Sequence, residues 1–157
     1  MLQHKLLATL SEKYNDLLRF EPAKTYYWSP KDSTVFYQDG DKTDVGLWTL
    51  LHEASHGLLK HKTYESDFEL VLLEVGAWEK AGSIAKELKI AIDEEHVQDC
   101  LDSYRDWQYK RSLCPNCDLG GVQLNQKTYE CLFCGNNWQV SSARFCRPYR
   151  RRTSSSH

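Results

Sequence analysis

The sequence predicts an α+β fold in which a helical body with a short β-hairpin precedes a small β-rich segment. Three observations predict this class. Apolar residues recur at three- and four-residue steps in four segments of the first 112 residues, which is the spacing of amphipathic helices. Two short runs of aromatic and β-branched residues flank a turn at 29–33, which indicates a hairpin. After residue 113, cysteine pairs and short β-prone runs replace the helical pattern.

Four helices are predicted in the body, and each has one apolar face. Their expected ranges are 2–18, 43–60, 66–88 and 93–110. Pro22 follows the first range and prevents its continuation, because proline lacks the backbone N–H that a helix needs. Thr43 or Asp44 can cap the second helix, and Ser66 or Asp67 the third, since short polar side chains accept hydrogen bonds from the first N–H groups of a helix.

Short strands are predicted in both parts of the chain. Those of the body are expected at 25–28 and 34–37, and those of the C-terminal segment at 121–124, 127–130 and 137–140. Three domains follow from these patterns. They are a body over 1–112, a β segment over 113–143 and a basic, serine-rich tail over 144–157, which is expected to be disordered.

Composition and charge exclude a membrane protein. Of the 157 residues, 41% are hydrophobic and 27% are charged, and the longest apolar runs, such as Leu70–Leu73, fall far short of the roughly 20 residues that a membrane span needs. No secretory signal is recognised, so a cytoplasmic location and no membrane contact are expected.

Charge is distributed unevenly along the chain. Residues 1–113 carry 14 basic and 20 acidic side chains, whereas residues 114–157 carry 6 basic and 2 acidic side chains. The basic end can meet an anionic partner.

Residues 52–56 read His-Glu-Ala-Ser-His within the second predicted helix. Because four residues make about one helical turn, His52 and His56 lie on the same face and can bind one zinc ion. Glu53 can accept a proton from water activated by that metal. Leucines on both sides indicate a buried helix, in which polar side chains need partners. The motif therefore predicts a catalytic zinc site with Glu53 as general base.

A catalytic zinc also needs a third protein ligand. Glu74 lies on the apolar face of the third predicted helix, where a carboxylate is unusual unless it is paired or bound to metal. Small residues along the same face permit close approach to the helix that carries the motif. Glu74 is therefore the expected ligand, and Glu69, Glu79 and His61 are the alternatives.

Two CxxC pairs, Cys114 with Cys117 and Cys131 with Cys134, are separated by 13 residues. Each pair can occupy a tight turn, and together they complete a tetrahedral four-thiolate site. In a reducing compartment this spacing indicates metal rather than disulfides. The pattern predicts a structural zinc ribbon, so two zinc ions are expected, one catalytic and one structural. The arginines that follow can contact the phosphates of a nucleic acid; they are Arg144, Arg147, Arg150, Arg151 and Arg152.

The runs Trp48-Thr-Leu-Leu-His-Glu-Ala-Ser-His-Gly-Leu-Leu and Leu73-Glu-Val-Gly-Ala-Trp78 resemble the gluzincin metallopeptidases, in particular the small ImmA/IrrE-type proteins of bacteria and mobile elements. The resemblance covers roughly residues 25–110. It implies a zincin-like body, a metal-binding glutamate on the helix after the motif, and proteolysis of a regulator, often a DNA-binding repressor. The expected function is zinc-dependent hydrolysis of peptide bonds in a protein substrate. The strand at 34–37 is expected to be the sheet edge that aligns the peptide.

Two alternatives stay open. The chain is also similar to SprT-like metalloproteases, which combine HExxH with a C-terminal zinc ribbon, act near DNA and use a third histidine, here His61 or His96. The other alternative is a non-catalytic module that binds nucleic acid or protein through the ribbon and tail. Replacement of Glu53 by Gln separates an enzyme, which loses activity, from a binder, which keeps its affinity.

Overall fold

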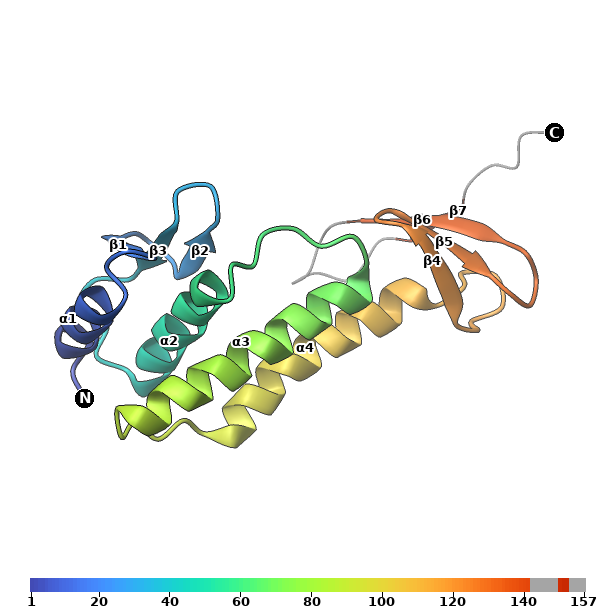
Figure 1. Cartoon of the computed structure of the whole chain (residues 1–157). Coiled ribbons are helices and arrows are strands. Elements are labelled where there is room, and N and C mark those ends of the chain that lie inside the picture. The colour runs from blue at the N-terminus through green and yellow to red at the C-terminus, as the bar shows by residue number, and fades with distance from the viewer. Residues whose placement is uncertain (142–149, 153–157) are drawn as a thin grey trace. The chain divides into compact units, whose positions relative to one another are not determined.

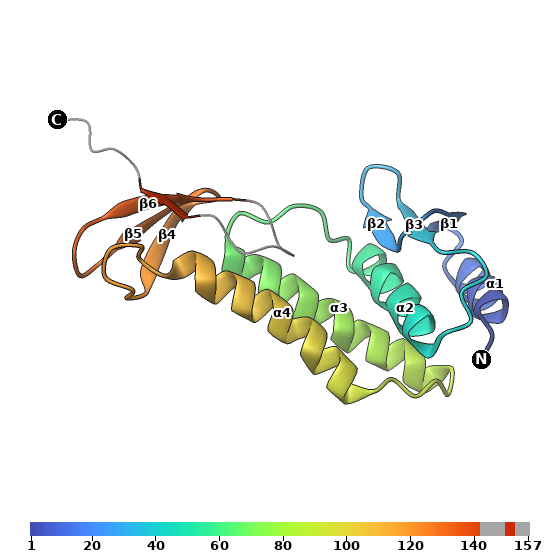
Figure 2. The same cartoon turned by 180° about the vertical axis from the view of Figure 1, so that it is seen from behind.

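The computed structural model describes residues 1–141 and 150–152, and it confirms an α+β fold (Figures 1 and 2). The helices are α1 (Gln3–Lys13), α2 (Asp44–Leu58), α3 (Asp67–Glu87) and α4 (Glu94–Ser112). The strands are β1 (Arg19–Pro22), β2 (Tyr27–Ser29), β3 (Thr34–Tyr37), β4 (Gly121–Asn125), β5 (Thr128–Cys131), β6 (Asn137–Val140) and β7 (Arg150–Arg152). Within these residues, no helix is both long and apolar enough to cross a bilayer.

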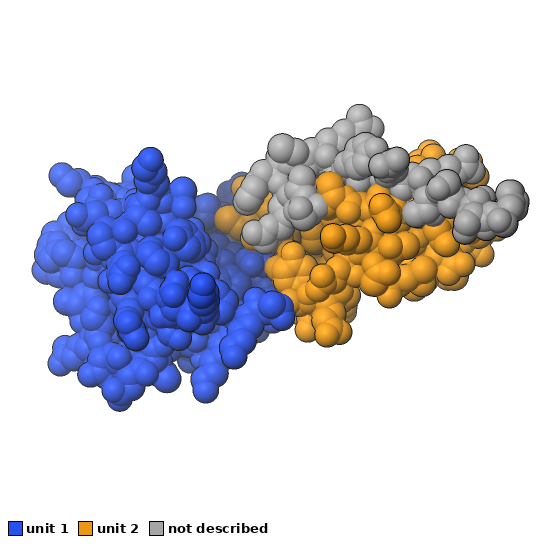
Figure 3. Space-filling view, turned by 90° about the horizontal axis from the view of Figure 1, so that it is seen from above, with its two compact units in different colours: residues 1–63, 73–97 blue, residues 64–72, 98–157 orange. Residues whose placement is uncertain are grey.

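The chain forms two compact units, coloured separately in Figure 3. The first unit contains residues 1–63 and 73–97, and the second contains residues 64–72 and those from 98 onward. Both α3 and α4 therefore contribute to each unit. The second unit takes in helical residues on the N-terminal side of position 112, where the sequence predicts a domain boundary; that boundary stays a prediction.

The first helix ends earlier than predicted. α1 stops at Lys13, although the apolar spacing continues to residue 18. The N–H groups of Leu17 and Leu18 both donate to the Tyr14 carbonyl, at 3.0 and 2.9 Å, so the chain turns. The intervening Asn-Asp pair favours such turns, because its side chains compete for backbone hydrogen bonds. The turn buries Leu18 in the core.

A three-stranded sheet follows α1, in the order β1-β3-β2. β2 and β3 form the predicted antiparallel hairpin, and β1, which the sequence analysis missed, pairs with β3 in parallel. The expectation that the strand at 34–37 is a sheet edge is wrong, because β1 covers its other side. β1 and β2 are the two edges.

α2 lies against this sheet, and two residues of the helix determine its placement. Thr43 caps α2 by accepting a hydrogen bond from the Gly46 N–H at 3.0 Å, as its sequence position predicts. A Cβ atom at Gly57 would lie 2.5 Å from the Leu18 side chain and 2.9 Å from the Trp28 ring. Glycine therefore permits a close approach of the motif helix to β2.

The second unit contains an antiparallel sheet in the order β4-β5-β6-β7. β4, β5 and β6 occupy the predicted positions to within a residue. β7 pairs with β6 along Arg150–Arg152, and the expected disorder of the tail stays a prediction. The remaining tail positions, 144–149 and 153–157, lie outside the described residues. We call residues 113–141 with β7 the cysteine ribbon.

A buried ion pair joins the cysteine ribbon to the helix ends of its unit. Arg111 in α4 and Asp67 at the start of α3 are 3% and 2% exposed, and Arg111 Nε lies 2.6 Å from Asp67 Oδ2. The Tyr129 hydroxyl donates to the same carboxylate at 2.6 Å, and the Trp138 indole donates to the Arg111 carbonyl at 3.0 Å. Two further backbone carbonyls accept from the guanidinium. This network accounts for the inclusion of helical residues in the second unit.

Candidate metal centres

Three buried side chains of the first unit converge at one point. α2 supplies His52 and His56 and α3 supplies Glu74. Nε2 of His52 lies 3.0 Å from Glu74 Oε2, and Nε2 of His56 lies 3.2 Å from Oε1. The two Nε2 atoms are 3.0 Å apart. All three residues are at most 9% exposed, and we call this group the histidine site.

The atoms of the histidine site fit a metal ion better than they fit one another. His52 Nδ1 and Glu74 Oε2 are buried without a hydrogen-bond partner among the described residues, although Oε2 lies close to His52 Nε2. Buried polar atoms without partners are rare and destabilising. Two imidazoles and one carboxylate, with an open fourth position, form a donor set that catalytic zinc uses. The histidine site can therefore hold a metal ion.

The charge state of Glu74 suits a ligand. Burial alone raises the pKa of this carboxyl, but the adjacent imidazoles of His52 and His56 outweigh burial and lower the pKa to about 2. The side chain is thus an anion at neutral pH. A carboxylate must be ionised to bind a cation, so Glu74 is in the form that can act as a ligand.

The structure places the alternative third ligands elsewhere. Nδ1 of His61 lies 2.8 Å from Nδ1 of His56, on the side of that ring opposite to the converging Nε2 atoms. Glu69 is exposed and accepts a hydrogen bond from the Glu65 N–H, and Glu79 is exposed on α3. Of the five residues considered from the sequence, which include His96, Glu74 is the one brought to both histidines of the motif.

Glu53 lies beside the ligand group but is not part of it. Its Oε2 atom accepts a hydrogen bond from the backbone N–H of Trp28 at 2.9 Å. Trp28 belongs to the edge strand β2, so the sheet holds the carboxylate of the motif in place. No sequence signal identifies this contact, because it links positions 25 residues apart through a backbone atom.

Aromatic packing orients His52. The Trp78 ring stacks on His52 with centroids 4.3 Å apart and planes 30° apart, and its edge meets His96 at 5.9 Å. His96, which the sequence offers as a third ligand, is therefore separated from His52 by the indole. The sequence signal for Trp78 is its position one helical turn after Glu74.

The four cysteines of the ribbon form a second cluster. Cys114 and Cys134 bring their sulfurs to 3.6 Å, and Cys117 and Cys131 to 3.5 Å. These separations are too long for disulfides. With Zn–S distances of about 2.3 Å, sulfurs at the corners of a tetrahedral site lie about 3.8 Å apart, close to the observed values. The cluster can therefore hold a metal ion.

Tight turns shape this cluster. The N–H of Asp118 donates to the Cys114 carbonyl and that of Gly135 to the Cys131 carbonyl, both in left-handed conformations (φ 57° and 72°). Burial raises the pKa of the Cys114 thiol, but backbone N–H groups of the turn outweigh it and lower the pKa to about 6. The turn thus favours the thiolate of Cys114, which is the form that binds metal. The backbone N–H of Leu119 lowers the pKa of the Cys117 thiol, but burial and the neighbouring cysteines outweigh it and raise the pKa to about 12.

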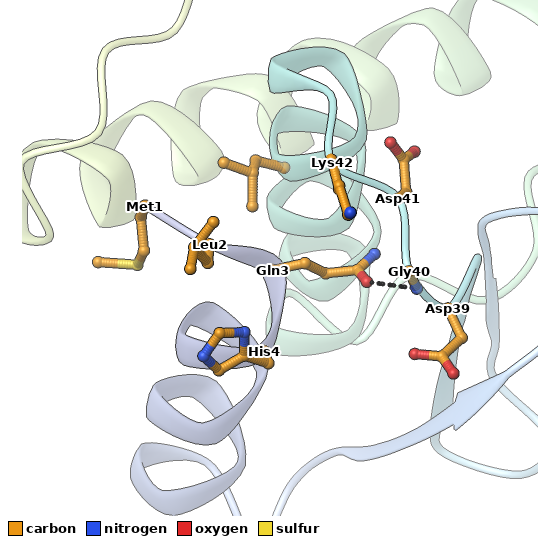
Figure 4. A pocket seen from close by; sticks show the side chains of 9 residues that line it. Met1, Leu2, Gln3, His4, Asp39, Gly40, Asp41 and Lys42 are labelled. Carbon is orange, nitrogen blue, oxygen red and sulfur yellow. Dashed lines mark hydrogen bonds between the residues drawn. The ribbon is translucent and has the colours of Figure 1, made fainter.

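A separate hollow of about 470 Å³ lies at the start of α1 and the loop before α2 (Figure 4). Gln3 Oε1 accepts from the Gly40 N–H at 3.1 Å, and Gln3 Nε2 donates to the Gln38 carbonyl at 2.7 Å. The buried amide thus fastens α1 to the loop, and no ligand of either cluster lines the hollow.

No family model matches the chain, and neither a curated protein nor a solved structure shows significant similarity to it.

Proposed function

We propose that the chain is a zinc-dependent metallopeptidase of the gluzincin type that hydrolyses peptide bonds in a protein substrate. His52, His56 and Glu74 are its metal ligands and Glu53 is its general base. One observation carries the proposal: the Nε2 atoms of two buried histidines lie 3.0 Å apart, and each lies within 3.2 Å of a carboxylate oxygen of Glu74, which comes from a second helix. A non-metal role would leave the buried Oε2 atom of Glu74 without a partner.

Each side chain has a defined task in this proposal. A zinc ion at the histidine site supplies a Lewis acid, which polarises a carbonyl group and lowers the pKa of water. Glu53 accepts a proton from the attacking water and returns it to the leaving amine. The Trp28 N–H holds the Glu53 carboxylate at 2.9 Å. As an edge strand, β2 is the element suited to align an extended peptide.

The proposal also covers the second metal, the compartment and the partners. The cysteine ribbon holds a structural zinc, since cysteines fill all four positions. Unpaired cysteines at these separations suit a reducing cytoplasm. The substrate is a protein, and by the resemblance noted above it is a regulator.

Nucleic-acid binding is the second candidate function, with the SprT-like type of protease as its enzymatic form. The observation that favours it is the placement of β7, which puts Arg150–Arg152 on the edge of the ribbon sheet. From residue 131 onward the sequence contains no acidic residue. Phosphate contacts by these arginines would weaken steeply as salt concentration rises.

Two substitutions, one beside the histidine site and one within it, test the leading proposal. Glu53→Gln should keep two zinc ions per chain and reduce hydrolysis of a fluorogenic peptide library about 10²–10⁴-fold, since the base is lost and the ligands remain. Glu74→Ala should lose the zinc of the histidine site and retain that of the ribbon. Glu79→Gln, an exposed change on the same helix, is the matched control. Wild-type hydrolysis by Glu53→Gln would refute the enzyme proposal.

A further inference from the structure

His61 contacts the histidine site from outside, through the ring of His56. It lies three residues beyond the end of α2, after Lys60, whose φ of 58° turns the chain back toward the helix. Its ring meets that of His56 at a centroid distance of 5.0 Å and an angle of 65°. The two Nδ1 atoms are 2.8 Å apart, which is a hydrogen-bond distance.

This contact links the tautomers of the two rings. One proton lies between the two Nδ1 atoms, so one ring donates and the other accepts. Nε2 of His56 faces Glu74 at 3.2 Å, so a ring that binds metal there must carry its proton on Nδ1. His56 is then the donor, and His61 is the acceptor with its own proton on Nε2.

Two hydrogen bonds hold the backbone of His61, the acceptor residue. Its N–H donates to the His56 carbonyl at 3.0 Å, and its carbonyl accepts from the Trp28 indole at 2.8 Å. Both backbone groups of His61 are thus hydrogen-bonded, so the residue that carries the acceptor ring is held in place. Trp28 also holds Glu53, so the same strand residue contacts the Glu53 carboxylate and the His61 backbone.

The other histidine of the site has no such partner. His52 Nδ1 is buried without a hydrogen bond among the described residues, and Trp78 restrains that ring by stacking. Metal-bound histidines generally donate their second N–H to a fixed acceptor, which orients the ring and raises its basicity. Among the described residues, that effect falls on His56 and not on His52.

We propose that His61 is a positioning residue that holds His56 in the tautomer able to bind metal through Nε2. This inference rests on the proposed metal at the histidine site. It assigns His61 an acceptor role behind a ligand, which differs from the role of third ligand considered from the sequence. Its removal should weaken metal binding without removing any ligand.

The test uses the full chain with its ribbon zinc in place. His61→Leu removes the acceptor at similar volume, and His61→Asn keeps an acceptor atom at the same position along the side chain. His4→Leu, an exposed histidine on α1, is the matched control. Chelator competition should show zinc bound about 10–100-fold more weakly at the histidine site in His61→Leu, and largely recovered binding in His61→Asn.

A second readout reports the tautomer directly. Long-range ¹H–¹⁵N spectra of the imidazoles, recorded with zinc in both sites, should show the wild-type His61 ring neutral, with its proton on Nε2 and with Nδ1 accepting from His56. The His56 Nδ1 proton should keep its hydrogen-bonded shift in His61→Asn and lose it in His61→Leu. Because the wild-type spectrum needs no variant, a His61 protonated on Nδ1 there would overturn the inference even if a variant failed to fold.

The outcomes separate this inference from the proposed function. Wild-type protein that binds zinc in the ribbon alone refutes the metallopeptidase, and with it the role of His61 in metal binding. Two zinc ions in the wild type, with unchanged affinity in His61→Leu, refute the positioning role and leave the metallopeptidase standing.

Discussion

The two candidate metal centres differ in what holds their ligands. The histidine site is built on α2 and α3. These helices also bury apolar residues that are not ligands, among them Leu50, Ala54 and Ala77. In the cysteine ribbon, by contrast, Cys114 and Cys131 belong to the small hydrophobic cluster itself. The helical scaffold therefore has a core of its own, whereas the ribbon's core is partly its ligand set. A ligand site on packed helices is preorganised, and one on turns forms together with its metal.

The largest effect should come from breaking the cysteine centre. Cys114→Ser should release the ribbon metal and unfold the ribbon together with 64–72 and 98–112, because Asp67 and Arg111 lose their ribbon partners. Structural zinc is worth about 10–16 kcal/mol in small domains, more than the ribbon can replace. Hydrogen exchange read by mass spectrometry should show protection kept in the first unit. Cys100→Ser is the control, and continued protection of the ribbon would contradict the comparison.

The buried ion pair should rank second. Arg111→Met leaves the Asp67 carboxylate buried and unpaired, which costs about 3–5 kcal/mol. Arg105→Met removes an exposed pair with Asp102 and should cost at most about 1 kcal/mol. Urea unfolding measures the loss of stability in both variants. Equal losses would show that burial does not make the Arg111–Asp67 pair more important than the exposed pair. Zinc at the histidine site should be retained in both variants.

A pair of glycine substitutions sharpens the account of the helical scaffold. Gly57→Ala should destabilise the first unit by about 1–3 kcal/mol, because the added methyl group meets Leu18 and Trp28. Gly82→Ala in α3 meets nothing within 4 Å and should stabilise by about 0.5–1 kcal/mol through helix propensity. Thermal unfolding should therefore shift in opposite directions, and shifts of the same sign would argue against the close approach of α2 to β2.

The smallest effect concerns the start of the motif helix. Thr43→Ala removes the side-chain oxygen that accepts from the Gly46 N–H, so it should cost about 1 kcal/mol. Thr43→Ser keeps the hydroxyl and should lie close to the wild type. Chemical denaturation measures the difference, and equal stability of the two variants would exclude a contribution from the cap.

Features with local sequence spacing were predictable, and those made by distant pairing were not. The histidines four residues apart and the paired cysteines carry their geometry in their spacing, and α2 begins at its predicted cap. β1 was missed because a four-residue strand with two charges and a proline has no alternation; its parallel partner lies 15 residues away. The end of α1 was misplaced because a turn, rather than apolar spacing, decides where that helix stops.

The same reasoning explains which parts of the histidine site were found. Glu74 was identified because its carboxylate interrupts an apolar stripe, a signal present in the sequence alone. The contacts of His61 and Trp28 depend on a left-handed residue and on a hairpin packed against a helix. Neither condition produces a periodic pattern in the sequence. Sequence reasoning could therefore name His61 as a histidine near the motif but not its acceptor role.

Trp28 has a consequence for how this position can vary over evolutionary time. It serves Glu53 through a backbone atom and His61 through an indole atom. Any amino acid except proline supplies the first, whereas only a side chain with a donor of similar reach supplies the second. Drift at position 28 would thus spare the support of Glu53 and erode that of His61. Substitutions at position 28 therefore conserve the backbone contact to Glu53 more readily than the side-chain contact to His61.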